Sequence, residues 1–339
     1  MNIIDATRRD EWDKFVTARP ETNFLQAWDF YEFHLMRGKK VVRRIAVDDA
    51  GKIVVAYAGV VETAKRGKYL AIAGGPIVDW DDIKLVQQIF EDIKTMGERE
   101  GCAFVRVRPQ LPLSEKSLKL MKQLGLKKAP MYLSVEYAGI LDLHKTETEI
   151  LAGASQGFRR KLRKAEKLDL EISAAADNET IKNFCELEKR HAARQKYVAF
   201  STDFLTKQFE AFREHNEVLI YTAKKDGEIL AQNFMIFYGP EASYHYGVSS
   251  ELGTKYSAAP LLHIKAMEEA RKRGCIRYNL WGIVEPSETS HRFYGVSEFK
   301  RSFGCEELKY TPAHDLILKP LAYQKTKIIE SVRKKIRHV

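Results

Sequence analysis

The chain has 339 residues, of which 45% are hydrophobic and 30% are charged. This length suits two domains that each have a core, and the composition is that of ordinary globular proteins, which excludes a coiled-coil rod and a disordered adaptor. Lys and Arg outnumber Asp and Glu by 56 − 46 = 10, which favours a polyanionic partner such as RNA, a pyrophosphate or an anionic membrane.

The excess positive charge is concentrated in two segments. Residues 155–167 carry six cations and one anion, and residues 319–339 carry seven cations and one anion, so the remainder of the chain is nearly neutral. The alternative to a site for a polyanion is a pair of solvated basic helices.

Four cysteines, Cys102, Cys185, Cys275 and Cys305, lie far apart in the sequence and far from histidines at metal-ligand spacing. We therefore expect buried thiols, with no disulfide, no metal and no other cofactor. The amino-terminal residues are charged, and no apolar run approaches the ~18 to 20 residues that span a bilayer, so we expect a cytoplasmic protein.

The first half of the chain has the periodicity of a hairpin followed by a strand, a helix and a strand. In chain order, these elements are predicted at residues 41–47, 53–61, 69–72, 80–100 and 102–107.

The second half repeats this order. The corresponding elements are predicted at residues 218–223, 229–237, 244–248, 258–272 and 276–280. The pairs Gly101-Cys102 and Gly274-Cys275 are offset by 173 residues, and the hairpin turns by about the same number. We predict an α+β fold made of two copies of one unit by internal duplication, with domains at residues 1–145 and 146–319.

The order of elements in each copy resembles that of acyl-CoA N-acetyltransferase (GNAT) domains. Such domains bind the CoA pyrophosphate through a Q/R-x-x-G-x-G/A loop before the central helix, where backbone N–H groups and the helix dipole favour an anion. The equivalent stretches here begin Gly74-Gly75-Pro76 and Gly253-Thr254-Lys255, and neither has that loop. We therefore expect an acyl donor other than CoA.

The most specific motif lies near the end of the second copy. From Tyr278 the chain reads YNLWGIVEPSETSHRFYGVSEFKRSFGCE, which includes F-K-R-S-F-G at residues 299–304. This resembles the Fem-type aminoacyltransferases (FemA, FemB and FemX), which carry a Y-D/N-x-x-G-I strand, a short loop and an F-K-x-x-F-G segment. Further matching segments are Leu25-Gln26-Ala27-Trp28, Gly75-Pro76 with Asp79, the cationic helix from Arg159 to Lys167, Tyr256 with Pro260, and Asp315-Leu316 before Pro320-Leu321.

The resemblance covers nearly the whole chain and implies tandem GNAT-like domains, of which the first binds the precursor. Residues 201–213 predict only one short helix where FemA-like members insert a long coiled-coil arm, so the chain is nearest the compact FemX type. The family moves an amino acid from an aminoacyl-tRNA to an amine of a UDP-linked or lipid-linked muropeptide, without a cofactor. We favour a monomer. The alternatives are an acyl-CoA-type N-acyltransferase on the same fold and a non-enzymatic basic adaptor that binds RNA or a membrane.

Lys300 is the candidate catalytic residue. Transfer from an ester to an amine passes through a tetrahedral oxyanion, which a fixed cation stabilises. Phe299 and Phe303 are spaced to pin a short helix to the core while Lys300 points aside and stays partly exposed. The alternative is an ordinary surface lysine beside two core aromatic residues.

Four further residues are candidates for substrate binding. Tyr246 and Tyr256 come from the third strand of the second copy and from the loop before its helix, and Trp281-Gly282 ends the last strand. Amphipathic rings there can line a pocket for a sugar or peptide, and a glycine permits close approach of a ligand. Rim packing of the tyrosines and core packing of Trp281 are the alternatives.

The basic segment 155–167 predicts a helix with Phe158, Leu162 and Ala165 on one stripe and cations on the remaining surface. Basic side chains grip phosphates irrespective of base sequence, as contact with an acceptor stem requires. We predict tRNA contacts from the residues Arg159, Arg163, Lys164 and Lys167. The alternative is a solvated helix that only connects the two domains.

The first copy departs from the Fem-type pattern at the end of its last strand. The family often has an acidic residue before a proline there, whereas this chain reads Arg106-Val107-Arg108-Pro109. Arg108 cannot act as a general base, so either that role is dispensable or the acceptor differs. The histidines form no recognisable triad with a carboxylate and a nucleophile, so covalent catalysis is not expected.

Residues 320–339 predict a basic amphipathic helix that begins at Pro320. Its apolar residues are Leu321, Ile328, Ile329, Val332 and Ile336, and its cations are Lys325, Lys327, Arg333, Lys334, Lys335 and Arg337. Two alternatives stay open: the apolar stripe rests on an anionic membrane, or it docks on the first domain with the cations turned to water or tRNA.

Overall fold

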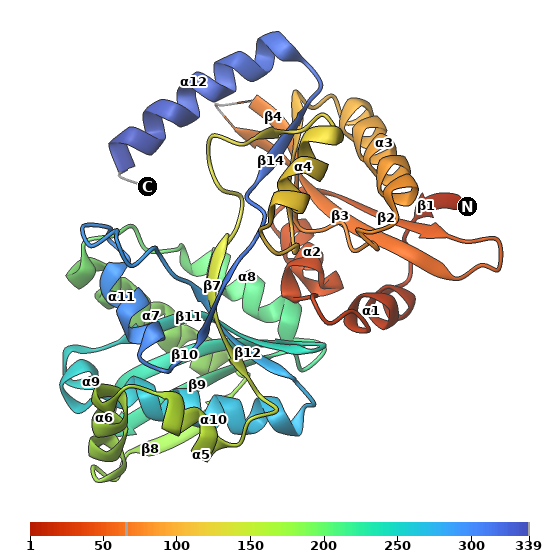
Figure 1. Ribbon diagram of the computed structural model, residues 1–339. Coiled ribbons are helices and arrows are strands. Elements are labelled where there is room, and N and C mark those ends of the chain that lie inside the picture. Colours follow the sequence, from red (N-terminus) through yellow and green to blue (C-terminus); the bar gives the residue numbers. More distant parts are fainter. Residues whose placement is uncertain (65–66, 338–339) are drawn as a thin grey trace. The chain divides into compact units, whose positions relative to one another are not determined.

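The computed structural model describes residues 1–64 and 67–337, with the side chains of residues 333–337 outside the description. The chain forms two compact units (Figure 1). Unit 1 consists of Met1–Tyr137 and Leu308–Val339, and unit 2 consists of Ala138–Glu307.

Unit 1 contains a seven-stranded sheet in the order β1-β2-β3-β4-β5-β14-β6. All neighbouring strands are antiparallel except β4 and β5, which are parallel. Its elements are β1 (Asn2–Asp5), α1 (Arg9–Thr17), the 3-10 helix η1 (Phe24–Gln26), α2 (Trp28–Met36), β2 (Lys40–Val47), β3 (Ile53–Ala64), β4 (Gly67–Gly74), α3 (Ile83–Arg99), β5 (Phe104–Pro109), α4 (Glu115–Gln123), β6 (Lys127–Lys128), β14 (His314–Ile317) and α12 (Pro320–Arg337).

Unit 2 contains a second seven-stranded sheet in the order β13-β7-β12-β11-β10-β9-β8, in which β11 and β12 pair in parallel. Its elements are β7 (Tyr137–Asp142), α5 (Glu147–Gly153), α6 (Gln156–Glu166), β8 (Glu171–Ala175), α7 (Asn178–Gln195), α8 (Thr202–Arg213), β9 (Val218–Lys225), β10 (Glu228–Tyr238), β11 (Glu241–Ser249), α9 (Glu251–Tyr256), α10 (Ala258–Lys272), β12 (Arg277–Gly282), α11 (Tyr294–Arg301) and β13 (Glu306–Lys309).

The predicted duplication and the tandem α+β fold are confirmed. In unit 1 the order β2-β3-β4-α3-β5 ends in a parallel pair, and in unit 2 the order β9-β10-β11-α10-β12 does the same. A hairpin joins antiparallel strands through a short turn, whereas a parallel pair requires a crossover, which the long helix provides in each unit.

The predicted domain boundaries at residues 145 and 319 are wrong, because each sheet takes in a strand from beyond its own continuous segment. In β7, Leu141 pairs with Tyr278 of β12 in unit 2. In β14, His314 pairs with Val107 of β5 in unit 1, so the chain returns to the first sheet before its end. These pairings join strands far apart in sequence, which local periodicity cannot show.

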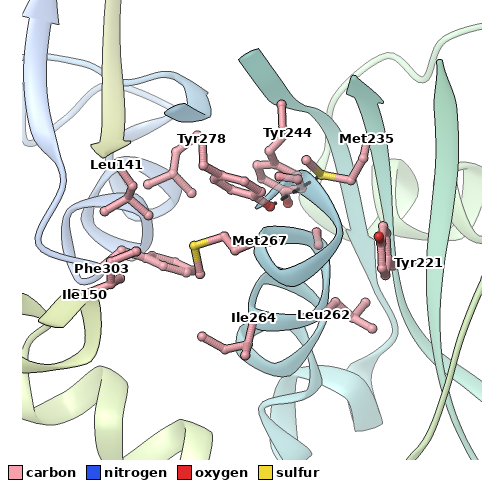
Figure 2. Packing of buried hydrophobic residues seen from close by; sticks show 14 of the residues in the cluster. Leu141, Ile150, Tyr221, Met235, Tyr244, Leu262, Ile264, Met267, Tyr278 and Phe303 are labelled. Carbon is pink, nitrogen blue, oxygen red and sulfur yellow. Dashed lines mark hydrogen bonds between the residues drawn. The ribbon is translucent and has the colours of Figure 1, made fainter. Parts of the chain in front are cut away.

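The core of unit 2 lies around α10, and Figure 2 shows Leu262, Ile264 and Met267 of that helix among side chains from neighbouring strands and helices. The predicted stripe of α6 is confirmed, since Phe158, Leu162 and Ala165 are all buried. Ser155 caps this helix by accepting a hydrogen bond from the Phe158 N–H at 3.1 Å.

The carboxy-terminal helix α12 is confirmed as a helix, but it docks on unit 1 through an unexpected face. Tyr323, Thr326 and Glu330 are buried, whereas the predicted apolar residues Leu321, Ile328 and Val332 are 90%, 65% and 51% exposed. The alternative in which the apolar stripe docks on the first domain is therefore wrong for these three residues. The side chains of Arg333, Lys334, Lys335, Ile336 and Arg337 lie outside the described part, as do residues 338–339.

The helix docks through these polar residues because it meets a buried cation. Arg106 of β5 forms ion pairs with Asp315 of β14 at 2.7 Å and with Glu330 of α12 at 2.8 Å, and both carboxylates are fully buried. Tyr323 donates a hydrogen bond to Asp315 at 2.9 Å. Strand β14 and helix α12 are thus attached to the first sheet by one buried network.

Candidate active site

Lys300 lies in the last turn of α11, and its side chain enters the interior of unit 2. Its Nζ donates a hydrogen bond to the Gly282 carbonyl oxygen at 2.7 Å and lies 5.8 Å from the centre of the Tyr244 ring. Only 7% of Lys300 is exposed, so the expectation of a partly exposed lysine pointing aside is wrong. The reason is that α11 lies across the end of β12 with this side chain turned inward.

The remaining residues of the F-K-R-S-F-G motif hold α11 in place. Phe303 is buried and its ring centre lies 4.2 Å from that of Phe158 in α6. Gly304 has a φ of +73°, and a Cβ there would lie 2.2 Å from the Gly153 carbonyl oxygen, so only glycine fits. The predicted pinning of this segment by aromatic residues is confirmed.

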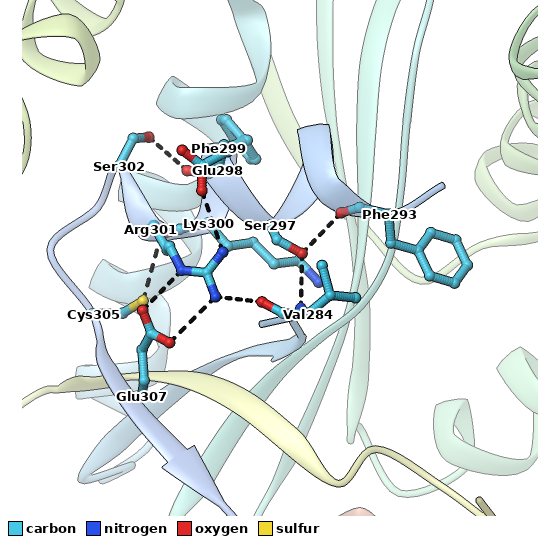
Figure 3. Close-up of polar contacts among 10 residues, drawn as sticks. All are labelled: Val284, Phe293, Ser297, Glu298, Phe299, Lys300, Arg301, Ser302, Cys305 and Glu307. Carbon is cyan, nitrogen blue, oxygen red and sulfur yellow. Dashed lines mark hydrogen bonds and ion pairs between the residues drawn. The ribbon is translucent and has the colours of Figure 1, made fainter. Parts of the chain in front are cut away.

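Polar contacts fix α11 to the loop that follows β12 (Figure 3). Ser297 Oγ accepts a hydrogen bond from the Val284 N–H at 3.0 Å and donates one to the Phe293 carbonyl at 2.8 Å. Arg301 donates to the Val284 carbonyl and forms an ion pair with Glu307 at 2.8 Å. Because these contacts flank Lys300 on both sides, they set the position of its ammonium group.

The neighbours of Lys300 include Tyr244, His263 and Cys305, and no compensating carboxylate lies near it among the described residues. Burial disfavours the ammonium form and lowers the pKa of Lys300 to about 7. Burial, with a smaller contribution from the Lys300 charge, lowers the pKa of His263 to about 3, so His263 is neutral and its Nδ1 lies 2.7 Å from the Tyr278 hydroxyl. An ammonium has three N–H donors and Gly282 occupies one, which leaves two for an oxyanion.

Two of the four predicted substrate-binding residues lie beside Lys300. Gly282 is its hydrogen-bond acceptor, and the preceding Trp281 has a φ of +66°, with its N–H donated to Asn279 Oδ1 at 2.7 Å. The ring centres of Trp281 and Tyr246 lie 5.6 and 3.9 Å from that of His245, and the Tyr246 ring also packs against Phe234 at 5.6 Å. A tryptophan in the left-handed region is uncommon and is typical of residues whose surroundings impose the conformation.

Sequence reasoning missed His245, Tyr244 and His263 as neighbours of this cluster. Strict alternation along β11 would place Tyr244 and Tyr246 on one face, but the Tyr244 ring packs against His263 of α10 whereas the Tyr246 ring packs against Phe234, so spacing alone could not have found these neighbours. The bulge between Phe234 and Met235 in the β10–β11 pairing interrupts that simple alternation. His263 is in α10, and only the packing of that helix places it near α11.

Tyr256, the fourth predicted residue, lies elsewhere. It ends α9 and packs against the core of unit 2. The Nζ of Lys164 in α6 donates to the neighbouring Lys255 carbonyl at 2.7 Å. The structure therefore places Tyr256 next to the basic helix.

The basic helix α6 exposes Arg163, Lys164 and Lys167, whereas Arg159 is half-buried. Arg159 donates hydrogen bonds to the carbonyl groups of Leu151 and Ala152 at 3.1 and 3.2 Å, at the end of α5. A guanidinium at a helix carboxy terminus satisfies carbonyl groups that have no partner within the helix. The geometry thus gives Arg159 a structural role and leaves three of the predicted cations accessible.

Unit 1 contains a cavity of about 330 Å³. Its lining combines aromatic rings with charged and titratable groups: Phe30, Tyr31, His34, Val60, Glu62, Tyr69, Ala71, Ala73, Arg106, Tyr132 and Leu133. Ligand sites are commonly clefts of this kind, with apolar walls and a few polar groups. The sequence offered no motif for it, because its residues come from α2, β3, β4, β5 and a loop.

Arg108 is buried where the family often has an acidic residue. Its Nε donates to Ser134 Oγ and its Nη1 to Gln110 Oε1, both at 2.6 Å. Its guanidinium also lies 5.1 Å from the centre of the Tyr310 ring. The position is thus filled by a hydrogen-bonded cation, which cannot take up a proton.

Within residues 1–64 and 67–337, no three His, Cys, Asp or Glu side chains are grouped to hold a metal ion. In the same residues, no helix combines the length and apolar character needed to cross a bilayer. Cys102, Cys185, Cys275 and Cys305 are free thiols.

Comparisons with known proteins agree with this architecture. The profile of the FemAB family matches residues 7–225, and that of an acetyltransferase (GNAT) domain matches residues 153–301. A lipid II:glycine glycyltransferase of Staphylococcus haemolyticus (strain JCSC1435) is 20% identical over 99% of this chain and 96% of its own length. The crystal structure of FemX superposes with a TM-score of 0.87 at 19% identity, covering 97% of this chain and 100% of FemX. A tandem GNAT protein from the clavulanic acid biosynthesis pathway gives 0.57 at 12% identity, over 93% of this chain and 98% of its own.

Proposed function

The chain belongs to the FemAB family, and on this premise we propose that it is an aminoacyltransferase that moves an amino acid from an aminoacyl-tRNA to an amine of a peptidoglycan precursor. The relative of known activity acts on lipid II, which supports a muropeptide as the acceptor. The main support is the buried ammonium of Lys300, which donates to Gly282 next to Trp281 and has two further N–H donors.

The proposed reaction needs one developing negative charge to be stabilised. The neutral amine of the acceptor attacks the carbonyl carbon of the aminoacyl ester, and the carbonyl oxygen becomes an oxyanion that accepts hydrogen bonds from Lys300. Collapse of the tetrahedral intermediate forms the amide and breaks the ester bond. The proton lost by the amine ends on the departing ribose hydroxyl, so atoms and charge balance without a covalent enzyme intermediate.

Other parts of the chain are proposed to bind the two substrates. The exposed cations Arg163, Lys164 and Lys167 of α6 are proposed to contact tRNA phosphates, which carry charge irrespective of base sequence. The cavity of unit 1 suits part of the muropeptide, since aromatic rings pack against sugar faces, while the charged groups of its lining, Glu62 and Arg106, are already ion-paired with Lys39 and with Asp315 and Glu330. Its volume of about 330 Å³ holds only a portion of such a molecule.

A CoA-dependent reaction is disfavoured by the amino termini of α3 and α10, the helices at which a GNAT domain would bind the CoA pyrophosphate. The carboxylate of Asp82 caps α3 by accepting the Leu85 N–H at 3.0 Å, which places negative charge where a pyrophosphate would bind. In the first turn of α10, Pro260 has no N–H to offer. A pyrophosphate needs several free N–H donors at such a terminus, and neither helix supplies them.

Product mass tests the proposed function. The protein is incubated with a pool of charged tRNA and either UDP-linked or lipid-linked muropeptide. We expect the muropeptide to gain the mass of one or more aminoacyl residues only when the tRNA is charged. Acetylation from acetyl-CoA would identify the rival enzyme, and tRNA binding without consumption of aminoacyl-tRNA would identify an adaptor.

The pH dependence of kcat/KM should show a descending limb near neutrality. Only the ammonium form of Lys300 stabilises the oxyanion, and because its pKa in the free protein is lowered to about 7, kcat/KM should fall as the pH rises through that value. The measurement is kcat/KM from about pH 6 to 9. In Lys300→Arg the cation stays protonated over this range, so the limb should disappear whatever the absolute rate. If Lys300→Arg keeps the same fall in activity with rising pH, a group other than Lys300 is losing the proton.

Neutralising the accessible cations of α6 should weaken tRNA binding in a salt-dependent way. The variant is Arg163→Gln, Lys164→Gln and Lys167→Gln in one chain. For single-stranded contacts, the slope of log K against log salt is about −0.7 per phosphate, so the loss of three contacts should flatten it by ~2. The matched control removes three exposed lysines elsewhere in unit 2, with Lys182, Lys265 and Lys272 changed to Gln. Equal slopes for the two triple variants would refute the role of α6.

A further inference from the structure

Helix α12 presents side chains for contact on two opposite faces. Tyr323, Thr326 and Glu330 are buried against unit 1, and the Tyr323 ring lies 5.3 Å from that of Phe104. Successive residues of an α-helix are rotated by about 100°, so Leu321, Ile328 and Val332 project about 180° away from that buried face. The helix therefore carries one docked face and one apolar face that contacts no partner among the described residues of unit 1.

The apolar face is continuous along the helix. Leu321, Ile328 and Val332 are 90%, 65% and 51% exposed, and their spacing of seven and four residues keeps them in one line. At 1.5 Å per residue, this line is about 16 Å long. Lys325 is exposed within the same line, so its alkyl stem extends the apolar surface while its ammonium reaches outward.

The charge of this segment is strongly positive. From Lys319 to the end of the chain there are seven Lys and Arg residues and one acid, Glu330. Glu330 is buried in an ion pair with Arg106, so it does not offset the cations on the exposed surface. An exposed apolar line with lysines around it is the pattern of helices that lie in the interface of a bilayer containing anionic lipids.

We propose that α12 rests on an anionic membrane, with Leu321, Ile328 and Val332 entering the boundary between headgroups and acyl chains and the lysines meeting lipid phosphates. The inference rests on the proposed function and deepens it, because a protein held at this surface meets an acceptor that is lipid-linked. An RNA partner would use the cations but leave the apolar line in water. A second copy of the chain would bring two positive helices together, which like charges oppose.

The fold prepares the helix for this role. Amphipathic peptides often lose affinity because they must become ordered on the membrane, whereas α12 is already held by the ion pair between Arg106 and Glu330 and by the Tyr323–Asp315 hydrogen bond. The surface offered to lipid is thus rigid before binding. The helix lies on the bilayer in this proposal and does not cross it.

The test is co-sedimentation of the full chain with vesicles. The variant Leu321→Gln, Ile328→Gln and Val332→Gln removes the apolar line and leaves the docked face intact. We expect wild type to bind vesicles of phosphatidylglycerol and phosphatidylcholine, to bind pure phosphatidylcholine at least ~10-fold more weakly, and the variant to lose at least ~10-fold in partitioning to the anionic vesicles. The matched control is Leu35→Gln, Leu113→Gln and Leu118→Gln, whose wild-type residues are 43%, 41% and 41% exposed elsewhere in unit 1, and it should bind as wild type does.

Two outcomes overturn the proposal: absence of wild-type binding to anionic vesicles, or equal binding by wild type and the α12 variant. A wild-type dimer that dissociates in the variant, seen by analytical ultracentrifugation without vesicle binding, would instead assign the face to a second copy. Activity measured without a bilayer, on a soluble UDP-linked acceptor and on a lipid-linked acceptor in detergent, separates this proposal from the proposed function. The α12 variant should keep the wild-type activity there, whereas absence of wild-type activity on both acceptors with preserved vesicle binding would refute the aminoacyltransferase alone.

Discussion

Replacing Lys300 with Met should lower kcat by about 10² to 10³, because loss of one oxyanion stabiliser typically costs that much in rate. The same change should raise stability. The pKa of Lys300 is lowered to about 7 by burial, so at neutral and acid pH the folded protein holds a desolvated ammonium that the unfolded chain keeps in water. Each unit of such a shift corresponds to about 1.4 kcal/mol, so Met should stabilise the fold by a few kcal/mol.

The sign of the stability change depends on pH. Between about pH 7 and the usual lysine pKa, the unfolded state binds more protons than the folded state, so wild type becomes more stable as the pH rises. The advantage of Lys300→Met in melting temperature should therefore be largest at neutral and lower pH and shrink toward pH ~10. Calorimetry and kcat are measured on the same samples. The control Lys265→Met removes an exposed lysine of α10 and should change neither quantity appreciably. A Lys300→Met protein with wild-type kcat would end the catalytic assignment.

Replacing Arg106 with Met should destabilise the protein by about 3 to 5 kcal/mol, because it leaves Asp315 and Glu330 buried without their counter-ion. The measurement is the free energy of unfolding by urea, together with limited proteolysis at the carboxy terminus. Proteolysis should be faster in the variant, since α12 loses the ion pair through Glu330. An unchanged free energy of unfolding would show that the network contributes nothing to the fold.

Two controls separate the lost ion pairs from the lost packing volume. In Arg106→Met, Asp315→Asn and Glu330→Gln combined, no buried charge remains, so most of the stability should return. Acidic pH should also help the single variant. Burial already raises the pKa of Asp315, and removal of the arginine raises it further, so the Asp315 carboxyl group becomes neutral in the folded state as the pH falls. The deficit relative to wild type should therefore be smaller at acid than at neutral pH.

Features that depend on neighbouring residues are predictable from the amino-acid sequence. The repeated order of strands and helices follows from hydrophobic periodicity, and the buried stripe of α6 follows from its spacing. The F-K-R-S-F-G segment identified the family because aromatic residues and glycine are required there by close packing against α6 and Gly153. The spacing of apolar residues and the position of Pro320 at the start likewise predicted helix α12.

Contacts between residues far apart in the sequence follow from the three-dimensional fold. Arg106 finds partners 209 and 224 residues away, and those contacts determine which face of α12 is buried. Strands β7 and β14 join sheets outside the segments predicted for them, which moved both domain boundaries. The burial of Lys300 and its lowered pKa arise from the way α11 lies across the end of β12. Hydrophobic periodicity predicts only whether a residue faces a core. Desolvation and ion pairing depend on which distant residues of the chain surround it.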